Sequence, residues 1–159
     1  MKTILAPIDF SPASESVVQE AAALARALDA QVVLLTVVQP PVIFTEYASL
    51  MNVAEITTRS EQEAASQLAR LEEQLNNDFI KTKAIQLTGS PISHIVAQAA
   101  KREADYIVLG SHGHTALYDL LVGSTAHGVL LRATCPVVIV PSNRAQVKSR
   151  AKQKRAVTA

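Results

Sequence analysis

Apolar residues along the chain form five short runs that are rich in β-branched side chains, and segments with a helical pattern separate these runs. Each run has the length and composition of a buried strand. Strands that alternate with helices are typical of βαβ units, in which the strands pair in parallel. The five predicted strands cover residues 3–9, 31–38, 80–87, 105–110 and 136–140.

The segments between the strands carry apolar residues at the spacing of one helix face. Two of them begin with Ser11-Pro12 and Ser90-Pro91. Serine followed by proline is a typical helix start, so we expect both serine hydroxyls to cap a helix. The predicted buried faces are Val17, Ala21, Leu24 and Leu28; Ala64, Leu68, Leu71 and Leu75; Ile92, Ile95, Val96 and Ala99; and Ala126, Val129, Leu130 and Ala133.

The order of the strands can be argued from their polarity. The run at 31–38 is apolar on both faces, which suits a central strand, whereas Lys81 and Lys83 in the third run suit a sheet edge. Of the two common orders, 2-1-3-4-5 and 3-2-1-4-5, this pattern favours the second. The sequence thus predicts an α/β fold, a three-layer sandwich with a five-stranded parallel Rossmann-like sheet. Ligands of such sheets bind where the order reverses, here at the loops that begin at Asp9 and Gly110.

Length and charge narrow the class of protein. A chain of 159 residues, 48% of them hydrophobic, suits one domain with a single core, which we place at residues 1–143. Six of the 15 basic residues and none of the 14 acidic ones lie in 144–159. We expect 144–159 to be a disordered, solvated tail rather than a site for nucleic acid or anionic membrane. Its basic residues are Arg144, Lys148, Arg150, Lys152, Lys154 and Arg155.

The sequence also favours a cytoplasmic protein. Charged residues interrupt the longest apolar region, so no membrane span is predicted, and the amino-terminal stretch is too short for a signal peptide. The single cysteine, Cys135, has no second cysteine for an internal disulfide, which favours a reducing compartment. We expect Cys135 to pack as a small apolar residue.

Four of the five glycines lie between residues 110 and 128, in a window that follows the fourth strand and leads into a helix. Glycine lets a ligand approach the backbone closely, and the start of a helix attracts phosphate. No lysine lies between residues 102 and 144, so this is not a Walker A loop, and backbone and hydroxyl groups would hold the phosphate. The spacing is G-x2-G-x9-G-S-T, through Gly110, Gly113, Gly123, Ser124 and Thr125.

Three blocks together resemble the universal stress proteins of the UspA family, in the branch that binds ATP. They are "ILAPIDFS", the glycine motif and "CPVVIVP", so the resemblance covers residues 1 to about 141. It implies a Rossmann-like sheet, a homodimer and ATP as the ligand, to which we add Mg²⁺ as an expectation. By matching position, the resemblance places Pro7, Ile8 and Asp9 against adenine and ribose, and the Val37 backbone at the adenine edge. It places Leu109, Gly110, His112 and Gly113 along ribose and phosphate. It places Gly123, Ser124 and Thr125 on the phosphates.

Two acidic residues bear on the ligand. Asp9 could bind Mg²⁺ or a ribose hydroxyl, or it could cap the loop before the first helix. At Tyr118-Asp119 the sequence departs from the family pattern, in which relatives often carry basic residues. Asp119 would repel a triphosphate unless Mg²⁺ lies between them.

Two other chemistries fit the glycine window less well. His112 and His114 are too few ligands for a zinc site, and no cysteine or further histidine has suitable spacing. Ser111, His112 and Asp119 supply the residue types of a serine hydrolase, but they lack the G-x-S-x-G placement of its nucleophile.

The expected function is that of a nucleotide-dependent regulator in the stress response, in which ATP orders the long irregular segment at 39–55 and sets the choice of an unidentified protein partner. A slow ATPase or phosphotransferase is the alternative. The window has no lysine, arginine finger or obvious water-orienting glutamine, which fast phosphoryl transfer requires.

The fifth strand predicts a dimer. In the order 3-2-1-4-5 it lies at a sheet edge, yet it carries no charge, and an uncharged edge is a template for pairing. Pro136 and Pro141 bracket the strand and would limit the pairing to a closed, two-fold dimer. The predicted interface consists of Val137, Val138, Ile139 and Val140.

Overall fold

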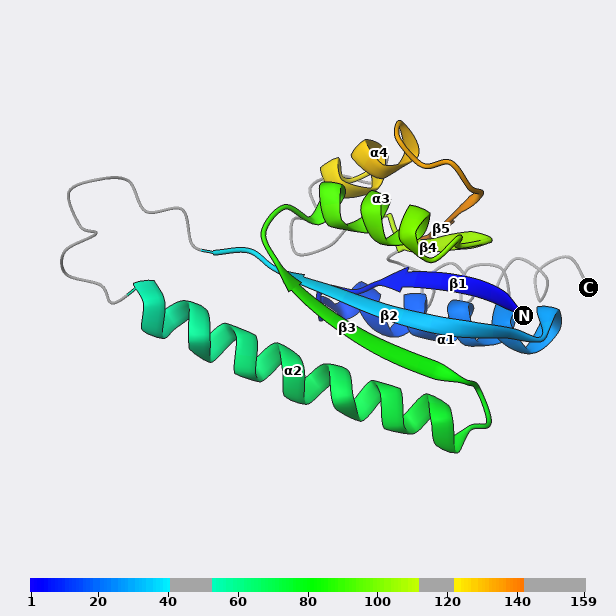
Figure 1. The fold of residues 1–159 in the computed structure, drawn as a ribbon, viewed down its shortest axis with the longest axis horizontal. Coiled ribbons are helices and arrows are strands. Elements are labelled where there is room, and N and C mark those ends of the chain that lie inside the picture. The colour runs from blue at the N-terminus through cyan, green and yellow to red at the C-terminus, as the bar shows by residue number, and fades with distance from the viewer. Residues whose placement is uncertain (41–52, 112–121, 142–159) are drawn as a thin grey trace, which may run out of the picture.

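The computed structural model describes residues 1–40, 53–111 and 122–141. Strands and helices alternate along this part of the chain (Figure 1). Each strand begins and ends within two residues of its predicted bounds. The elements are β1 (Lys2–Pro7), α1 (Pro12–Leu28), β2 (Ala30–Val38), α2 (Val53–Asn77), β3 (Thr82–Thr88), α3 (Pro91–Lys101), β4 (Tyr106–Gly110), α4 (Ser124–Leu130) and β5 (Val137–Val140).

The five strands form one parallel sheet in the order β3-β2-β1-β4-β5, which confirms the predicted fold and strand order. From the central β1, the chain adds β2 and β3 on one side and then β4 and β5 on the other. The order therefore reverses between β1 and β4, and β3 and β5 are the two edges.

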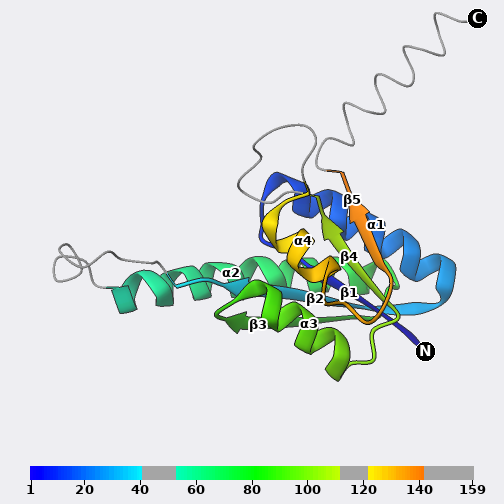
Figure 2. The ribbon, with the colours of Figure 1, turned by 90° about the horizontal axis from the view of Figure 1, so that it is seen from above.

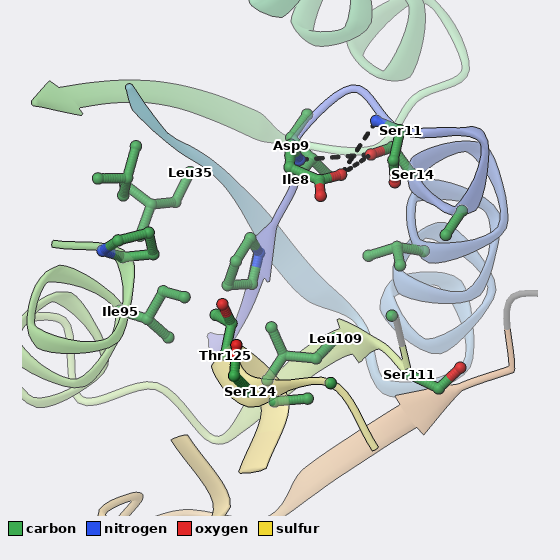
Figure 3. A pocket seen from close by; sticks show the side chains of 18 of the residues that line it. Ile8, Asp9, Ser11, Ser14, Leu35, Ile95, Leu109, Ser111, Ser124 and Thr125 are labelled. Carbon is green, nitrogen blue, oxygen red and sulfur yellow. Dashed lines mark hydrogen bonds between the residues drawn. The ribbon is translucent and has the colours of Figure 1, made fainter. Parts of the chain in front are cut away.

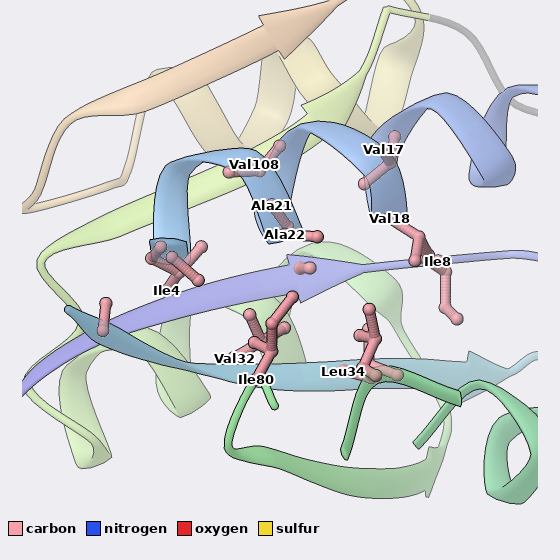
Figure 4. Packing of buried hydrophobic residues seen from close by; sticks show 14 of the residues in the cluster. Ile4, Ile8, Val17, Val18, Ala21, Ala22, Val32, Leu34, Ile80 and Val108 are labelled. Atoms are coloured by element: carbon pink, nitrogen blue, oxygen red, sulfur yellow. The ribbon is translucent and has the colours of Figure 1, made fainter. Parts of the chain in front are cut away.

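Helices cover both faces of the sheet, α1 and α2 on one side and α3 and α4 on the other (Figures 1 and 2). Because successive strand residues point to opposite faces, Ile4 and Leu34 pack under α1 and α2, whereas Leu5 and Leu35 pack under α3 and α4. Figure 4 shows the first of these two clusters. Both faces of the central strands are buried, which explains their continuous apolar sequence.

The helix starts are correctly placed, but the expected serine caps are absent. Ser11 and Ser90 occupy the N-cap positions of α1 and α3, each before a proline, yet neither side chain makes a capping hydrogen bond. Before α1 the carboxylate of Asp9 instead caps the loop that leads into the helix. Its Oδ1 accepts hydrogen bonds from the Ser11 N–H and the Ser14 hydroxyl, both at 3.0 Å.

The helix α4 is shorter than its apolar pattern predicts. It ends at Leu130, which is 44% exposed rather than buried, and Ala133 lies beyond the helix. The glycine at position 128 belongs to helix packing: a Cβ there would lie 2.5 Å from Cδ1 of Ile92, so its absence lets α4 approach α3 closely. One of the four clustered glycines therefore has a structural reason that the sequence did not reveal.

Cys135 packs against the cluster under α3 and α4. Burial, and next the negative charge of Asp105, raise the pKa of its thiol above the ordinary value. The thiol is thus protonated at neutral pH, as suits a packing residue. None of the described helices is long and apolar enough to cross a membrane.

Candidate functional site

A cavity of about 330 Å³ opens at the carboxyl ends of the central strands, where the strand order reverses (Figure 3). This is the position at which open α/β sheets bind their ligands. The cavity is lined by the ends of β1, β2 and β4 and by the starts of α1, α3 and α4. Its lining residues are Pro7, Ile8, Asp9, Ser11, Ala13, Ser14, Val17, Leu35, Val37, Gln39, Pro91, Ile95, Leu109, Gly110, Ser111, Gly123, Ser124, Thr125 and Ala126.

Nine of the eleven predicted binding residues line this one cavity. The other two, His112 and Gly113, lie outside the described residues, as do His114, Tyr118 and Asp119. The structure therefore brings together segments that are up to 118 positions apart in the chain, between Pro7 and Thr125. The nine are Pro7, Ile8, Asp9, Val37, Leu109, Gly110, Gly123, Ser124 and Thr125.

The loop from β1 to α1 is held in a fixed shape around Asp9. Besides the two bonds to its Oδ1, the Asp9 N–H donates to the Ser14 hydroxyl oxygen at 3.3 Å. Phe10 has φ = 58°, a left-handed conformation that costs a non-glycine residue roughly 1–3 kcal/mol. Of the three predicted roles of Asp9, the structure shows loop capping, and the roles with Mg²⁺ and ribose stay predictions.

One wall of the cavity combines apolar side chains with a backbone edge. The Leu35 carbonyl accepts from the Ile8 N–H at 2.9 Å, so this residue's backbone groups face β1. The N–H and C=O groups of successive residues in a strand point to opposite sides. Val37 lies two residues after Leu35, so its N–H and C=O groups point to the same side of β2 as those of Leu35. Because β1 ends at Pro7, the Val37 edge borders the cavity, next to the side chains of Leu35 and Ile95.

The opposite wall is formed where β4 leads toward α4. The Ser111 N–H donates to the Val140 carbonyl at 2.8 Å, and the Gly123 N–H donates to the Ser111 carbonyl at 2.7 Å. These two bonds fix both ends of the glycine window beside β5. Gly123 has φ = −57° and ψ = 158°, a conformation open to any residue. Backbone conformation thus does not explain why residue 123 is a glycine.

Among the described residues, the lining of the cavity carries negative charge but no lysine or arginine. Asp9 carries the one formal charge among the described lining residues, and neither lysine nor arginine belongs to that lining. Within the described part of the chain, no three histidine, cysteine, aspartate or glutamate side chains gather where they could hold a metal ion. A divalent cation here would have Asp9 as a protein ligand and would need oxygen atoms of the ligand itself.

Sequence reasoning missed several lining residues. Ser14 was missed because the helix pattern gave it no role, although its hydroxyl makes two hydrogen bonds with Asp9. Ser11 was assigned to capping, yet it is 5% exposed and its hydroxyl has no hydrogen-bond partner among the described residues. Pro91 and Ile95 were assigned to the start and buried face of α3, and only the packing of α3 beside β2 brings them to the cavity.

Comparisons with known proteins find relatives over most of the chain. The sequence model of the Universal stress protein family matches residues 1–141. The chain is 33% identical to Universal stress protein MJ0531 of Methanocaldococcus jannaschii, over 87% of this chain and 81% of that protein. It is similar to the solved structure of hypothetical protein MJ0577, with a TM-score of 0.75, 30% identity and coverage of 88% and 95% of the two chains. It is also similar to UspA from Lactobacillus plantarum, with a TM-score of 0.77, 26% identity and coverage of 87% and 97%.

Two more distant structures of the same fold were solved with nucleotides. A universal stress protein in complex with cAMP has a TM-score of 0.61, 21% identity and coverage of 89% and 98% of the two chains. The protein from Archaeoglobus fulgidus in complex with dAMP has a TM-score of 0.59, 21% identity and coverage of 87% and 97%.

Proposed function

The chain belongs to the universal stress protein family, and from this premise we propose that it binds ATP, together with Mg²⁺, in the cavity between β1 and β4. In this proposal the bound nucleotide is a signal, and the protein is a regulator in the stress response that acts through a protein partner. The observation that carries the proposal is the convergence of nine predicted nucleotide contacts on one cavity at the reversal of the strand order.

The wall at β2 suits an adenine base. The side chains of Leu35, Val37 and Ile95 offer apolar surface to a flat ring. The N–H and C=O groups of Val37 border the same space and can pair with the hydrogen-bonding edge of the ring. Ligand sites of this kind combine apolar walls with a few polar groups that fix orientation.

The wall at β4 and α4 suits phosphate. Gly110 and Gly123 leave the backbone bare, and the conformation of Gly123 does not itself require glycine. Ser124 and Thr125 add hydroxyl donors on the same wall. Asp9 would hold Mg²⁺ jointly with phosphate oxygens, a common arrangement for this cation.

The residues that line the cavity favour a regulatory function over catalysis of phosphoryl transfer. Phosphoryl transfer depends on cationic groups that stabilise the transition state, and the described lining contains neither lysine nor arginine. The alternative, a slow ATPase or phosphotransferase, predicts steady release of phosphate or transfer to an acceptor. Measurement of turnover over hours, with the Asp9→Asn variant as a control for contaminating enzymes, separates the two functions.

Calorimetric titration with ATP and Mg²⁺ tests the site, supported by mass spectrometry of nucleotide that copurifies with the protein. Gly123→Val should abolish binding, because the side chain fills the space through which phosphate reaches the backbone. Its φ and ψ suit valine, so the fold should be kept. Val122→Ala, a change at the exposed neighbouring residue, is the control. Unchanged affinity in Gly123→Val would contradict the placement.

A second titration tests the metal. Asp9→Asn keeps an Oδ1 that accepts from Ser11 and Ser14, so the loop should hold its shape while the charge is lost. We expect Mg·ATP binding to weaken more than metal-free ATP binding. Asp29→Asn, at an exposed left-handed position that asparagine tolerates, is the matched control. Equal losses with and without Mg²⁺ would mean that Asp9 is only a hydrogen-bond partner.

We further propose a homodimer through β5, in the cytoplasm. The backbone groups of Pro136 and Val140 face β4, as their hydrogen bonds to Ile107 and Ser111 indicate. Because successive residues of a strand point their N–H and C=O groups to opposite sides, those of Val137 and Ile139 point away from β4, toward the free side of β5. A two-fold axis through Val138 would pair Val137 of each copy with Ile139 of the other.

A further inference from the structure

We propose that the side chain of Gln39 binds the N7 side of the adenine base and thereby helps to select this base. This inference rests on the proposed function, because it concerns the same nucleotide in the same cavity. Gln39 directly follows β2 and lines the cavity. None of the nucleotide contacts predicted from the sequence involves it, so this polar lining residue has no other assigned role.

The backbone of β2 limits how a base can pair beside it. The Val38 carbonyl accepts from the Gly89 N–H at 2.9 Å and points toward β3, whereas the Leu35 carbonyl accepts from the Ile8 N–H on the β1 side. Because successive residues point their N–H and C=O groups to opposite sides, both groups of Val37 point to the β1 side, where the cavity lies. A base at this edge meets one donor and one acceptor.

The direction of β2 then sets the orientation of the base. Within a residue the N–H group precedes the C=O group along the chain, so the carbonyl of Val37 lies nearer to Gln39 than its N–H does. On the Watson–Crick edge of adenine, N1 accepts and the N6 amino group donates, so N1 faces the N–H and N6 faces the carbonyl. The N7 side of the ring, which lies beyond N6, is thereby turned toward Gln39.

Glutamine has the chemistry that this side of adenine requires. Gln39 lies two residues after Val37, about 6.6 Å farther along the strand direction. Its Nε2 can donate to N7 while its Oε1 accepts from N6, the bidentate pairing that glutamine makes with adenine. The N6 amino group has two N–H bonds, one for the Val37 carbonyl and one for Gln39, so all these contacts can form together.

The wall of the cavity at β2 and α3 offers no second side chain of this kind among the described residues. The other lining residues of this wall are apolar: Leu35, Val37, Pro91 and Ile95. Figure 3 shows Leu35 and Ile95 together on one side of the cavity. The Gln39 side chain is exposed, and its amide has no hydrogen-bond partner among the described residues. The amide can therefore turn toward a bound base without breaking a described contact.

The test is a double-mutant cycle between this side chain and N7 of the base. ATP and 7-deaza-ATP, in which a C–H group replaces N7, are titrated by calorimetry into the full-length wild type and into Gln39→Leu. Leucine is apolar and neither donates nor accepts a hydrogen bond. Gln67→Leu, the same change at an exposed position of α2 outside the described lining, is the matched control.

We expect the wild type and Gln67→Leu to bind ATP about three- to tenfold more tightly than 7-deaza-ATP, which is the contribution of one neutral hydrogen bond. This preference should vanish in Gln39→Leu. It should also vanish in Gln39→Glu, which keeps an acceptor for N6 but has no donor for N7. AMP and 7-deaza-AMP should give the same ratios, because the contact involves the base and not the phosphates.

Three results would overturn the proposal. Equal affinity of the wild type for ATP and 7-deaza-ATP would show that N7 makes no contact, while the proposed nucleotide site would stand. A preference for ATP that persists in Gln39→Leu would assign N7 to another group, such as the Val37 N–H. A wild-type protein that binds neither compound would remove the proposed function and this inference together.

Discussion

The two edges of the sheet differ in how their outward backbone groups are treated. At β3, side chains of α2 occupy them: the Thr82 N–H donates to Oδ1 of Asn76 at 3.0 Å, and the Ala84 N–H donates to Oε1 of Glu72 at 3.0 Å. Nδ2 of Asn76 also donates to the Thr82 carbonyl, at 3.4 Å. At β5, no described residue offers the outward groups of Val137 and Ile139 such a side chain.

This difference teaches how side chains of the same chain can close one edge of a sheet, while the described residues leave its other edge uncovered. Charged side chains were predicted to protect β3, and Lys83 is indeed exposed there, although Lys81 precedes the strand. The direct protection comes instead from Asn76 and Glu72, which lie one helical turn apart on α2 and follow the edge. Occupied groups of this kind cannot pair with another chain.

The largest expected effect is at the open edge. Ile139→Pro removes an outward N–H without touching the β4–β5 hydrogen bonds, so it should convert the proposed dimer to a monomer. Ile139→Ala shortens the side chain but keeps the N–H, and it should remain dimeric. Sedimentation at tens of micromolar protein distinguishes the two variants. Identical sedimentation of both would contradict pairing through β5.

The choice of position 139 follows from the outward direction of its backbone N–H. Val138 was the obvious residue to charge from the sequence, but its side chain packs against the cluster that contains Ile4 and Val140. Lysine at 138 would therefore disturb the core as well as the edge. The side chain of Ile139 also packs against a cluster, the one under α3 and α4. The alanine variant therefore serves as the reference that separates loss of this packing from loss of the outward N–H.

A smaller effect is expected when the covered edge loses its main partner. Asn76→Ala leaves both backbone groups of Thr82 without their side-chain partner, which should lower the free energy of unfolding by about 1–3 kcal/mol. Asn77→Ala, at the exposed next position of α2, is the matched control. Denaturant unfolding of both variants measures the difference, and equal stability would show that water replaces Asn76 without cost.

Glu72→Ala should have a smaller effect still, about 1 kcal/mol. It removes a single acceptor, from the Ala84 N–H, and Glu72 is only partly buried, so water can take its place. Glu73→Ala, the exposed neighbour on the same helix, is the comparison in the same unfolding experiment. A loss of stability that equals or exceeds that of Asn76→Ala would mean that Glu72 protects the β3 edge at least as strongly as Asn76 does.

The smallest expected effect is that of removing residues 144–159. A chain that ends at Asn143 should keep its Tm within a few degrees, because the two clusters that form the core lie within residues 4–140. The truncated protein also tests what covers the β5 edge of the sheet. A change of oligomeric state on truncation would mean that the removed segment, rather than a second copy, is the natural cover of β5.

Local signals predicted much of this molecule. The apolar runs located the strands because burial on both faces demands continuous hydrophobic sequence, and the lysines before and within β3 marked an edge because charge is costly at the sheet centre. The serine caps were wrong at both helices. At α1 the Ser11 side chain is buried, and the Ser11 N–H donates to the Asp9 carboxylate two residues earlier. The predicted burial of Leu130 was wrong: it is the last residue of α4 and is 44% exposed there.

The sequence by itself determined the fold class and the strand order, which follow from periodicity and charge. The family resemblance, with the glycine spacing, supplied nine of the nineteen described residues that line the cavity. Only the tertiary structure decided that Ser14 joins Asp9 in holding the loop before α1, that Gly128 serves the contact with Ile92, and that Asn76 and Glu72 close one edge. Those facts depend on contacts between side chains and backbone groups that spacing in the chain does not encode. The distance between two groups is set by packing, and packing is a property of the whole fold.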